Sequence, residues 1–411
     1  MAVTARDKSV IQGLAARVAE IAALPVQREK AELWRRLNSL ERVRPMVILQ
    51  NGTWHQTGDQ IELEAEDEWI RGHEWGLRAT LYHWDHMRDD TVYEGVIYSP
   101  VVIRDNGMGI HTDSTAPDHV FGARRYNPII ADGDDPARVT MPTVAVDWEE
   151  TERLYERYCD LYDGVLAVEK RGAAFHWFNM MDQFIEWRGI ENAMIDMIDR
   201  PEWVRAWMER LTAWHESRLD QYGELGVLSL NNGANGVGPG GLGFTDELPQ
   251  ADFDGVHVRT ADLWGHAATQ IFSEVSPAMH EEFALRYERR LLDRFGLNGY
   301  GCCEPLDKKT DILRSIPRLR RVSMSPWIDP ARGAEGLGSD FIFSFKPNPA
   351  VIGMEAWNED LARSILRDAL EKTRGCVVEV IMKDLHECRR EPQRMWAWVK
   401  MAMQLAEEFA E

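Results

Sequence analysis

The sequence predicts a (β/α)8 barrel of the TIM type, with an N-terminal helical extension and an extra β-hairpin. Three observations predict this α/β fold. From Val144 onward, short apolar runs alternate with segments of helical periodicity. Helical segments of about ten residues or more separate the runs, and parallel strands need such crossover connections. Counting from Val47, eight apolar runs are available, which is the strand number of a closed barrel.

Residues 1–44 are predicted to form the helical extension. Apolar residues from Leu14 onward follow the helical period, Pro25 interrupts it, and the period resumes at Leu33. We therefore expect the barrel to occupy residues 45–411.

The segment that follows the extension is predicted to hold the first strand, a helical region and the hairpin. Residues 45–49 form a short apolar run before a turn signal, and residues 60–88 are helical. Residues 93–105 are predicted to be extended on both sides of Pro100. A proline inside such a run indicates an edge strand, so we expect a hairpin beside the main sheet. Residues 107–140 are rich in loop-forming residues.

The other predicted elements alternate along the rest of the chain. Apolar runs typical of strands lie at residues 165–169, 227–230, 256–258, 297–300, 319–324, 341–344 and 376–381. Helices are predicted at residues 149–162, 177–222 (with breaks near Gly189 and at Pro201), 277–295, 307–315, 359–372 and from 392 onward. Ser276 is the expected N-cap of the long helix, and His280 is expected on its surface.

Composition and charge exclude several classes of function. The formal net charge is −21, which argues against a nucleic-acid partner. No apolar run approaches the ~20 residues of a membrane span, and the N-terminal residues lack the layout of a signal peptide. Five cysteines are present, an odd number without a disulfide-scaffold pattern. That usage fits a reducing compartment, so a cytoplasmic protein without a membrane partner is expected.

Residues 236–241 match the G-x-G-x-x-G pattern of dinucleotide sites. That pattern requires a helix directly after it, and Gly243 and Pro249 prevent one. We expect a mobile glycine-rich flap over the barrel mouth instead.

Polar side chains follow most predicted strands, and in a barrel the residues after the strands share one face. Catalytic roles are expected for Asp262, His266, Glu304, Lys383 and Asp384. Substrate-binding roles are expected for Glu169, Arg171, Asn231, Asn232, Trp264, Gln270, Ser325, Trp327, Lys346, Asn348 and His386. The alternative for each of them is a helix cap or a solvated loop residue.

Two adjacent thiols, Cys302 and Cys303, follow the predicted strand at 297–300. Thiolates are soft metal ligands and good nucleophiles. A zinc site formed by Cys302, Cys303 and Cys376 is one interpretation, with an open position for substrate. The alternatives are that the pair is buried packing, and that Cys376 lies at the opposite barrel end. A regular strand would direct only one thiol inward, whereas a bend at Gly301 would permit both.

Three stretches show a motif order found in a known family: Ser276-Pro277-x-Met279-x-x-Glu282-Phe283, Tyr300-Gly301-Cys302-Cys303 and Lys383-Asp384-x-His386. From about Met141 onward they resemble the uroporphyrinogen decarboxylase superfamily. The chain is more similar to the branch with corrinoid-dependent methyltransferases than to the haem-pathway decarboxylase. The resemblance implies a (β/α)8 barrel.

The resemblance also implies a ligand set. Methyltransferases of this superfamily hold zinc through a His-x-Cys motif at the fifth strand and a later cysteine. Here Cys303 falls at the motif cysteine and Cys376 at about the expected distance, while Gly301 stands at the histidine position, with Cys302 beside it. The arginine-rich pocket of the decarboxylase has no match in residues 42–45 or 54–56, so that activity is not implied.

The leading function is therefore methyl transfer between a small methylated substrate (methoxy, methylamine or thiol) and a separate corrinoid protein, assisted by zinc. No cobalamin-binding Asp-x-His-x-x-Gly stretch is visible, so the corrinoid requires a partner. The alternative is a metal-independent decarboxylase or lyase of a small carboxylated substrate. There Asp262 or Asp384 would donate a proton, and Arg171, Lys346 and Lys383 would hold carboxylates. A barrel that only binds a ligand or a partner protein is a third option, and a homodimer is left open.

Overall fold

The computed structural model describes residues 4–58, 61–117, 122 and 124–410. A curled sheet of seven strands lies at its centre, in the order β1-β13-β12-β11-β10-β9-β8, and every neighbouring pair is parallel. These strands are β1 (Met46–Asn51), β8 (Trp177–Phe178), β9 (Trp264–Ala267), β10 (Leu297–Tyr300), β11 (Leu319–Met324), β12 (Ile342–Phe345) and β13 (Val377–Leu385). Apolar residues fill most of their positions, as expected for parallel strands that are buried on both faces.

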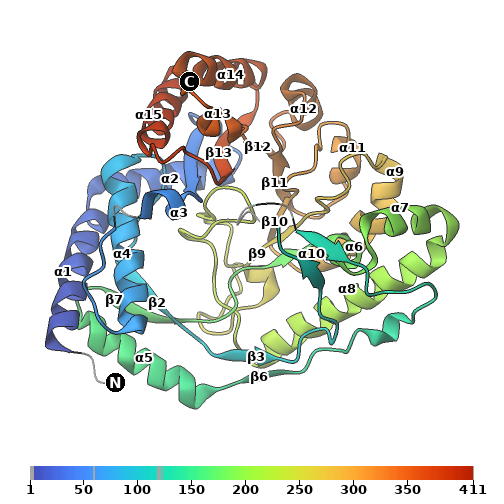
Figure 1. The fold of residues 1–411 in the computed structure, drawn as a ribbon, viewed down its shortest axis with the longest axis horizontal. Helices are drawn as coiled ribbons and strands as arrows, with labels where there is room; N and C mark the ends of the chain where they lie inside the picture. The colour runs from blue at the N-terminus through green and yellow to red at the C-terminus, as the bar shows by residue number, and fades with distance from the viewer. Residues whose placement is uncertain (1–3, 59–60, 118–121, 123, 411) are drawn as a thin grey trace.

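Helices surround the curled sheet as an outer ring (Figure 1). The first half of the chain contributes α1 (Ala5–Ala22), α2 (Pro25–Asn38), α3 (Trp54–Thr57), α4 (Glu68–His86), α5 (Trp148–Tyr162), α6 (Met180–Arg188), α7 (Ile190–Asp199) and α8 (Pro201–Glu224). The second half contributes α9 (Pro277–His280), a π-helical turn (Glu281–Leu285), α10 (Arg286–Leu292), α11 (Thr310–Leu313), α12 (Pro330–Leu337), α13 (Ala350–Gly353), α14 (Glu359–Lys372) and α15 (Gln393–Glu408). Short 3-10 turns lie at Pro136–Arg138 and Thr260–Asp262.

The sheet is an open half-barrel. In the described part of the chain, β1 and β8 are its two edges. A separate parallel pair, β2 (Val96–Pro100) with β7 (Ala167–Arg171), lies outside it, and the predicted strand at 227–230 contributes only a bridge between Leu228 and Ala173. The parallel α/β architecture is thus present, whereas the closed eight-stranded ring is not formed by these pairings.

The predicted hairpin at residues 93–105 is wrong. The strand β2 pairs in parallel with β7, and β3 (Ile103–Asp105) pairs in antiparallel fashion with β6 (Val144–Val146). Pro100 is the last residue of β2. The proline therefore marks the end of one strand, after which the chain leaves for another partner. A further antiparallel pair is formed by β4 (Asp113–Thr115) and β5 (Arg125–Asn127).

Local sequence signals predicted several helices and strands correctly. The helix breaks at Pro25, Gly189 and Pro201 are confirmed, and β10, β11 and α14 have the predicted bounds. Ser276 is confirmed as an N-cap, because its Oγ accepts a hydrogen bond from the Met279 amide at 3.3 Å.

Two further predictions are wrong, one for the segment before β9 and one for His280 in α9. Residues 256–258 form no strand, and the strand of this region begins at Trp264. His280 is not on a helix surface; it is fully buried, with its Nε2 2.7 Å from the Tyr300 hydroxyl.

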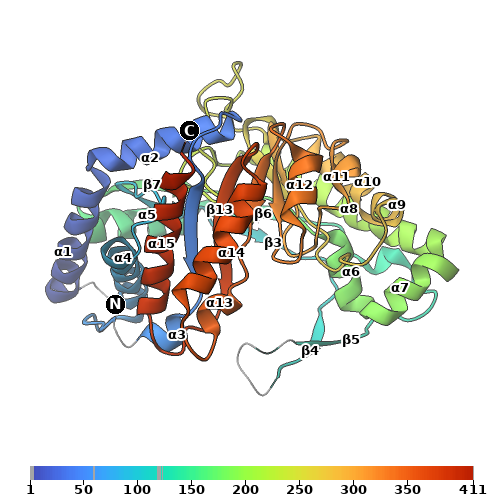
Figure 2. The same ribbon diagram turned by 90° about the horizontal axis from the view of Figure 1, so that it is seen from above.

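The glycine-rich segment at 236–241 does not cover the mouth, so the predicted flap is wrong. A Cβ on Gly238 would lie 2.4 Å from His266, and one on Gly240 would lie 2.4 Å from Arg321. These neighbours belong to β9 and to the first half of β11, so the segment packs inside the curled sheet. In Figure 2, α3 and α13 follow the C-terminal ends of β1 and β12 at the bottom, whereas the olive loop before β9 projects from the top. Glycine permits this close backbone approach.

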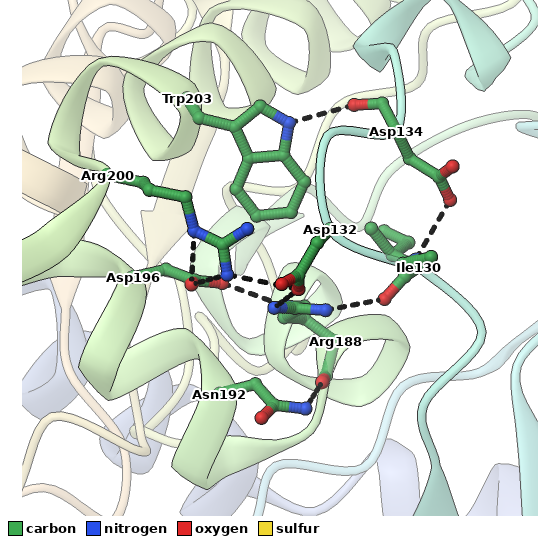
Figure 3. Close-up of polar contacts among 9 residues, drawn as sticks. Ile130, Asp132, Asp134, Arg188, Asn192, Asp196, Arg200 and Trp203 are labelled. Atoms are coloured by element: carbon green, nitrogen blue, oxygen red, sulfur yellow. Dashed lines mark hydrogen bonds and ion pairs between the residues drawn. The ribbon is translucent and has the colours of Figure 1, made fainter.

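An ion-pair cluster ties the loop at residues 130–134 to α6, α7 and α8 (Figure 3). The Asp196 carboxylate is fully buried and receives Arg188 Nε at 2.7 Å and Arg200 Nε at 3.0 Å. Both guanidinium groups also contact Asp132, and Arg188 Nη1 donates to the Ile130 carbonyl at 2.9 Å. The cluster therefore fixes the junctions between three consecutive helices.

Within the described ranges, no single helix is long and apolar enough to cross a membrane, while α1 and α2 taken together across their 59° bend have the required length and composition. In the fold, Ile11 and Trp34 of these helices are fully buried in core clusters.

Candidate functional site

The C-terminal ends of β10 and β13 bring two thiols and a lysine together. Beyond Tyr300, Gly301 adopts a φ of 89°, and the chain leaves the strand direction. Cys302 Sγ and Cys303 Sγ then lie 3.5 Å apart. From β13, Lys383 Nζ lies 3.5 Å from the Cys302 sulfur and 3.4 Å from the Cys303 sulfur. Both thiols therefore face the same ammonium group.

The backbone that carries the thiols is held by buried hydrogen bonds. The Cys302 amide donates to Glu304 Oε2 at 2.9 Å, and Ser323 Oγ donates to the Cys302 carbonyl at 3.0 Å. His266 Nε2 lies 3.0 Å from the Gly301 carbonyl oxygen. A Cβ at Gly301 would meet Leu306 at 2.3 Å, so only glycine fits this turn.

The electrostatics of the pair favour one thiolate. The hydrogen bond with Cys302 is the main cause that lowers the pKa of Cys303 to about 7, and Lys383 adds to it against the effect of burial. The pKa of Cys302 is raised by its role as the donor to Cys303 and by burial. Burial lowers the pKa of Lys383, but the two sulfurs and Asp384 outweigh it and hold that pKa above its usual range. Above a pH of about 7 the thiolate form of Cys303 therefore predominates, beside a lysine ammonium.

Asp384 completes this group at the solvent side. It forms an ion pair with Lys383, and its Oδ2 lies 3.9 Å from the Cys303 sulfur. Its backbone φ is 55°, a conformation in which non-glycine residues are uncommon. The carboxylate is exposed, so the site has a solvent-facing side.

Two backbone amides engage the carboxylate of Glu304. Its Oε1 accepts from the Thr269 amide at 3.1 Å and its Oε2 from the Cys302 amide. Burial raises the pKa of this carboxyl. Glu304 is therefore a positioning residue that links the loop after β9 to the thiol segment.

A buried polar group lies deeper in the sheet interior. Lys346 Nζ contacts Ser344 Oγ, which in turn donates to Glu379, and Arg321 Nη2 lies 3.0 Å from Glu379 Oε2. Burial lowers the pKa of Lys346 to about 7. All four residues are buried, so this group has the character of a core network below the thiols.

Asp262 is misplaced by the sequence prediction. It precedes β9, at the end of the sheet opposite the thiols. Its carboxylate accepts from Arg259 Nε at 2.9 Å and from the Gln250 amide at 3.0 Å. Trp264 and His266 lie within β9, where Trp264 Nε1 donates to the Gly243 carbonyl at 2.9 Å. The predicted catalytic role of Asp262 is therefore not supported by its position.

The zinc ligand set of Cys302, Cys303 and Cys376 is not formed. Cys376 precedes the first residue of β13, whereas Cys302 and Cys303 follow the last residue of β10, so they lie at opposite ends of parallel strands. The Cys376 thiol is directed toward the Ala334 carbonyl at 3.9 Å. Across the residues that the structure describes, no group of three or more His, Cys, Asp and Glu side chains is arranged to hold a metal ion. Three protein ligands for zinc are thus not assembled here.

Eight of the eleven predicted binding residues fall into two groups. The first group has structural partners away from the thiols. Asn231 Nδ2 donates to the Ala174 and Trp264 carbonyls, and Asn232 Nδ2 donates to the Leu248 carbonyl. Glu169 and Arg171 belong to β7, outside the main sheet, where Arg171 lies over the Tyr98 ring at 4.3 Å.

The second group follows the C-terminal ends of the main strands. Ser325 and Trp327 come after β11, where the Trp327 side chain is 70% exposed. Asn348 follows β12 and accepts from the Ala350 amide at 2.9 Å. His386 follows β13 directly. These residues share the end of the sheet on which the thiols lie.

Gln270 lines a cavity of about 690 Å³ that sequence reasoning missed. Asp182, on α6, also lines it and accepts from the Gln270 and Ile271 amides at 3.1 and 3.2 Å. Burial raises the pKa of Asp182 to about 7. An acidic residue in the first turn of a helix is common, so the sequence carried no signal for its burial in a cavity.

Of the comparisons with known proteins, the one with solved structures shows a similar architecture. No protein-family model matches the chain, and no curated protein matches its sequence. A solved structure described as a methyltransferase from Methanosarcina mazei is similar, with a TM-score of 0.51 and 11% sequence identity. The similarity covers 92% of this chain and 97% of that one. Because the identity is low, this similarity shows a shared architecture alone, which extends over nearly the full length of both proteins.

Replacing Lys383 by methionine is expected to raise the pKa of the Cys303 thiol from about 7 toward the ~8.5 of an ordinary thiol. Loss of the positive charge disfavours the thiolate, so a more alkaline pH is needed to ionise it. The pH dependence of iodoacetamide labelling of the tryptic peptide 295–308 measures this shift. Lys372→Met, on exposed α14, should leave the labelling curve unchanged, and overlapping curves for Lys383→Met and the wild type would refute the assignment.

Proposed function

We propose that this protein is a methyltransferase that moves a methyl group between a small methylated substrate and a separate corrinoid protein. The observation that carries the proposal is the thiol pair, whose two sulfurs lie within 3.5 Å of Lys383 Nζ at the C-terminal ends of parallel strands. A thiolate is a strong nucleophile toward carbon, and enzymes with parallel barrels keep their chemistry at this end. The shared architecture with a protein described as a methyltransferase supports the same conclusion.

In this proposal each residue has a distinct task. The Cys303 thiolate receives the methyl group, Cys302 donates a hydrogen bond to it, and Lys383 keeps it ionised. Glu304 fixes the backbone of Cys302. A corrinoid carried by a partner protein would be the other methyl carrier of the reaction, to which or from which the methyl group moves. The half-exposed Cys303 and the exposed Asp384 give that partner a solvent-facing side to approach.

A decarboxylase or lyase of a small carboxylated substrate is the second candidate. It is favoured by two lysines near the same end of the sheet: Lys383 in β13 and the buried Lys346, which directly follows β12. Cationic groups hold carboxylates and stabilise developing negative charge. With Asp262 at the opposite end, Asp384 remains as its proton donor.

The test is an assay of methyl exchange with the purified protein. Methylcobalamin serves as the methyl donor for a panel of small thiols, and reduced cob(I)alamin serves as the methyl acceptor for panels of methylamines and methoxy compounds. We expect the cobalamin spectrum to change in the presence of one class of substrate, because the site then transfers its methyl group. Release of carbon dioxide from carboxylated compounds, without any methyl exchange, would overturn the proposal in favour of the second candidate. Elemental analysis of the same sample measures whether the protein binds zinc, which the family resemblance implies.

A further inference from the structure

We propose that Cys302 and Cys303 are an oxidation site for hydroperoxides, at which they form a reversible disulfide between adjacent residues. The two sulfurs lie 3.5 Å apart, so a small movement of the side chains brings them to the ~2.05 Å of a disulfide bond. Formation of this disulfide does not depend on the proposed methyl transfer, whereas any effect of the oxidation on methyl transfer rests on that proposed function.

The two thiols have different access to solvent, which assigns their order of reaction. Cys303 is half-buried, whereas Cys302 is only 5% exposed and lies behind it. Lys383 Nζ contacts both sulfurs, and a cationic neighbour favours the reactive form of a thiol. A hydroperoxide therefore meets Cys303 first, and Cys302 is the thiol that resolves the product.

The reaction balances in two steps. The Cys303 sulfur attacks the outer oxygen of the hydroperoxide, its oxygen–oxygen bond breaks, and Cys303 sulfenic acid and an alcohol (or water) are formed. The Cys302 thiol then attacks the Cys303 sulfur, the sulfur–oxygen bond breaks, and water leaves with the Cys302 proton. Two thiols are oxidised, and one hydroperoxide is reduced.

Backbone geometry makes this disulfide easy to reduce again. The Cα atoms of adjacent residues lie about 3.8 Å apart, below the ~4.4–6.8 Å of ordinary disulfides. A bond outside that range is strained, and strained disulfides are the labile ones. The segment after Gly301 has irregular backbone, which allows the peptide between the cysteines to adjust. A small dithiol such as dithiothreitol is therefore expected to restore both thiols.

Mass spectrometry tests the proposal without any assay of activity. The tryptic peptide 295–308 contains Cys302 and Cys303 and no other cysteine, while Cys159, Cys376 and Cys388 fall in separate peptides. After treatment of the native protein with one equivalent of hydrogen peroxide, we expect this peptide to lose the mass of two hydrogen atoms. Dithiothreitol should return it to its original mass.

Two variants separate the pair from the other thiols. In Cys302→Ser, Cys303 should stop at the sulfenic acid and be trapped by dimedone, while Cys159→Ser should behave as the wild type. A peptide that keeps both thiols, or that gains oxygen atoms without losing two hydrogens, overturns the proposal. If the disulfide forms and methyl exchange was never observed, the oxidation site stands and the proposed function fails.

Discussion

Replacing Cys303 by serine is expected to lower the rate of methyl transfer on the order of a hundredfold or more. The serine hydroxyl stays protonated near neutral pH, so the nucleophile beside Lys383 is lost although the side chain keeps nearly the same shape. The measurement is the initial rate of methyl transfer between the free corrinoid (methylcobalamin for a thiol acceptor, cob(I)alamin for a methylated donor) and the substrate class that the wild type accepts.

The matched control is Cys159→Ser, because Cys159 lies on α5 and is also partly exposed. It should retain the wild-type rate. Cys302→Ser should fall between the two, since the serine hydroxyl can still donate a hydrogen bond to the Cys303 sulfur. Wild-type rates for Cys303→Ser would mean that the thiols are packing residues and that the methyl group is transferred elsewhere.

Replacing Glu379 by glutamine is expected to lower the free energy of unfolding by about 3–5 kcal/mol. Glu379 and Arg321 are fully buried partners, and Glu379 also accepts hydrogen bonds from the Gly241 amide at 3.1 Å and from Ser344. The variant leaves the Arg321 charge without its counter-ion inside the sheet. The midpoint of urea unfolding measures the loss.

A double replacement identifies the cause of that loss. Arg321→Met together with Glu379→Leu removes both charges, so the double variant should be more stable than Glu379→Gln alone. Glu371→Gln, on the exposed face of α14, should change stability by less than about 0.5 kcal/mol. If the double variant is the least stable protein of the series, packing and hydrogen bonds outweigh the unpaired charge.

Sequence patterns predicted the parts of this fold that local signals specify. The apolar runs of β10 and β11 and the helical period of α14 gave their observed bounds. Gly301 permitted the observed bend, although the sequence left open whether one thiol or both would face inward. At these places propensity, period and turn chemistry agree. The same signals therefore located the thiol pair after β10 but not the arrangement of its side chains.

The errors arose where contacts distant in the sequence decide the outcome. The strand β9 contains Gly265 and His266, which are atypical of strands, and Gly265 is required because a Cβ there would meet Phe295 at 2.6 Å. His280 is buried because Tyr300 and Lys309 supply its partners. Neither contact is visible along the chain, so Asp262 and His280 were placed on the wrong side of their elements.

Strands that are neighbours in the sheet are synthesised at different times, because they lie far apart in the chain. In the sheet, Met46 of β1 pairs with Glu379 of β13, and both faces of β1 pack into core clusters. At about 5–20 residues per second, a ribosome would deliver β13 on the order of 20–60 s after β1. For that interval β1 is an apolar strand without its permanent neighbour, which is a template for aggregation. The helix α2 is made before β1 and shares a core cluster with Met46 and Ile48 of that strand, so it can cover one face of β1 until translation is almost complete.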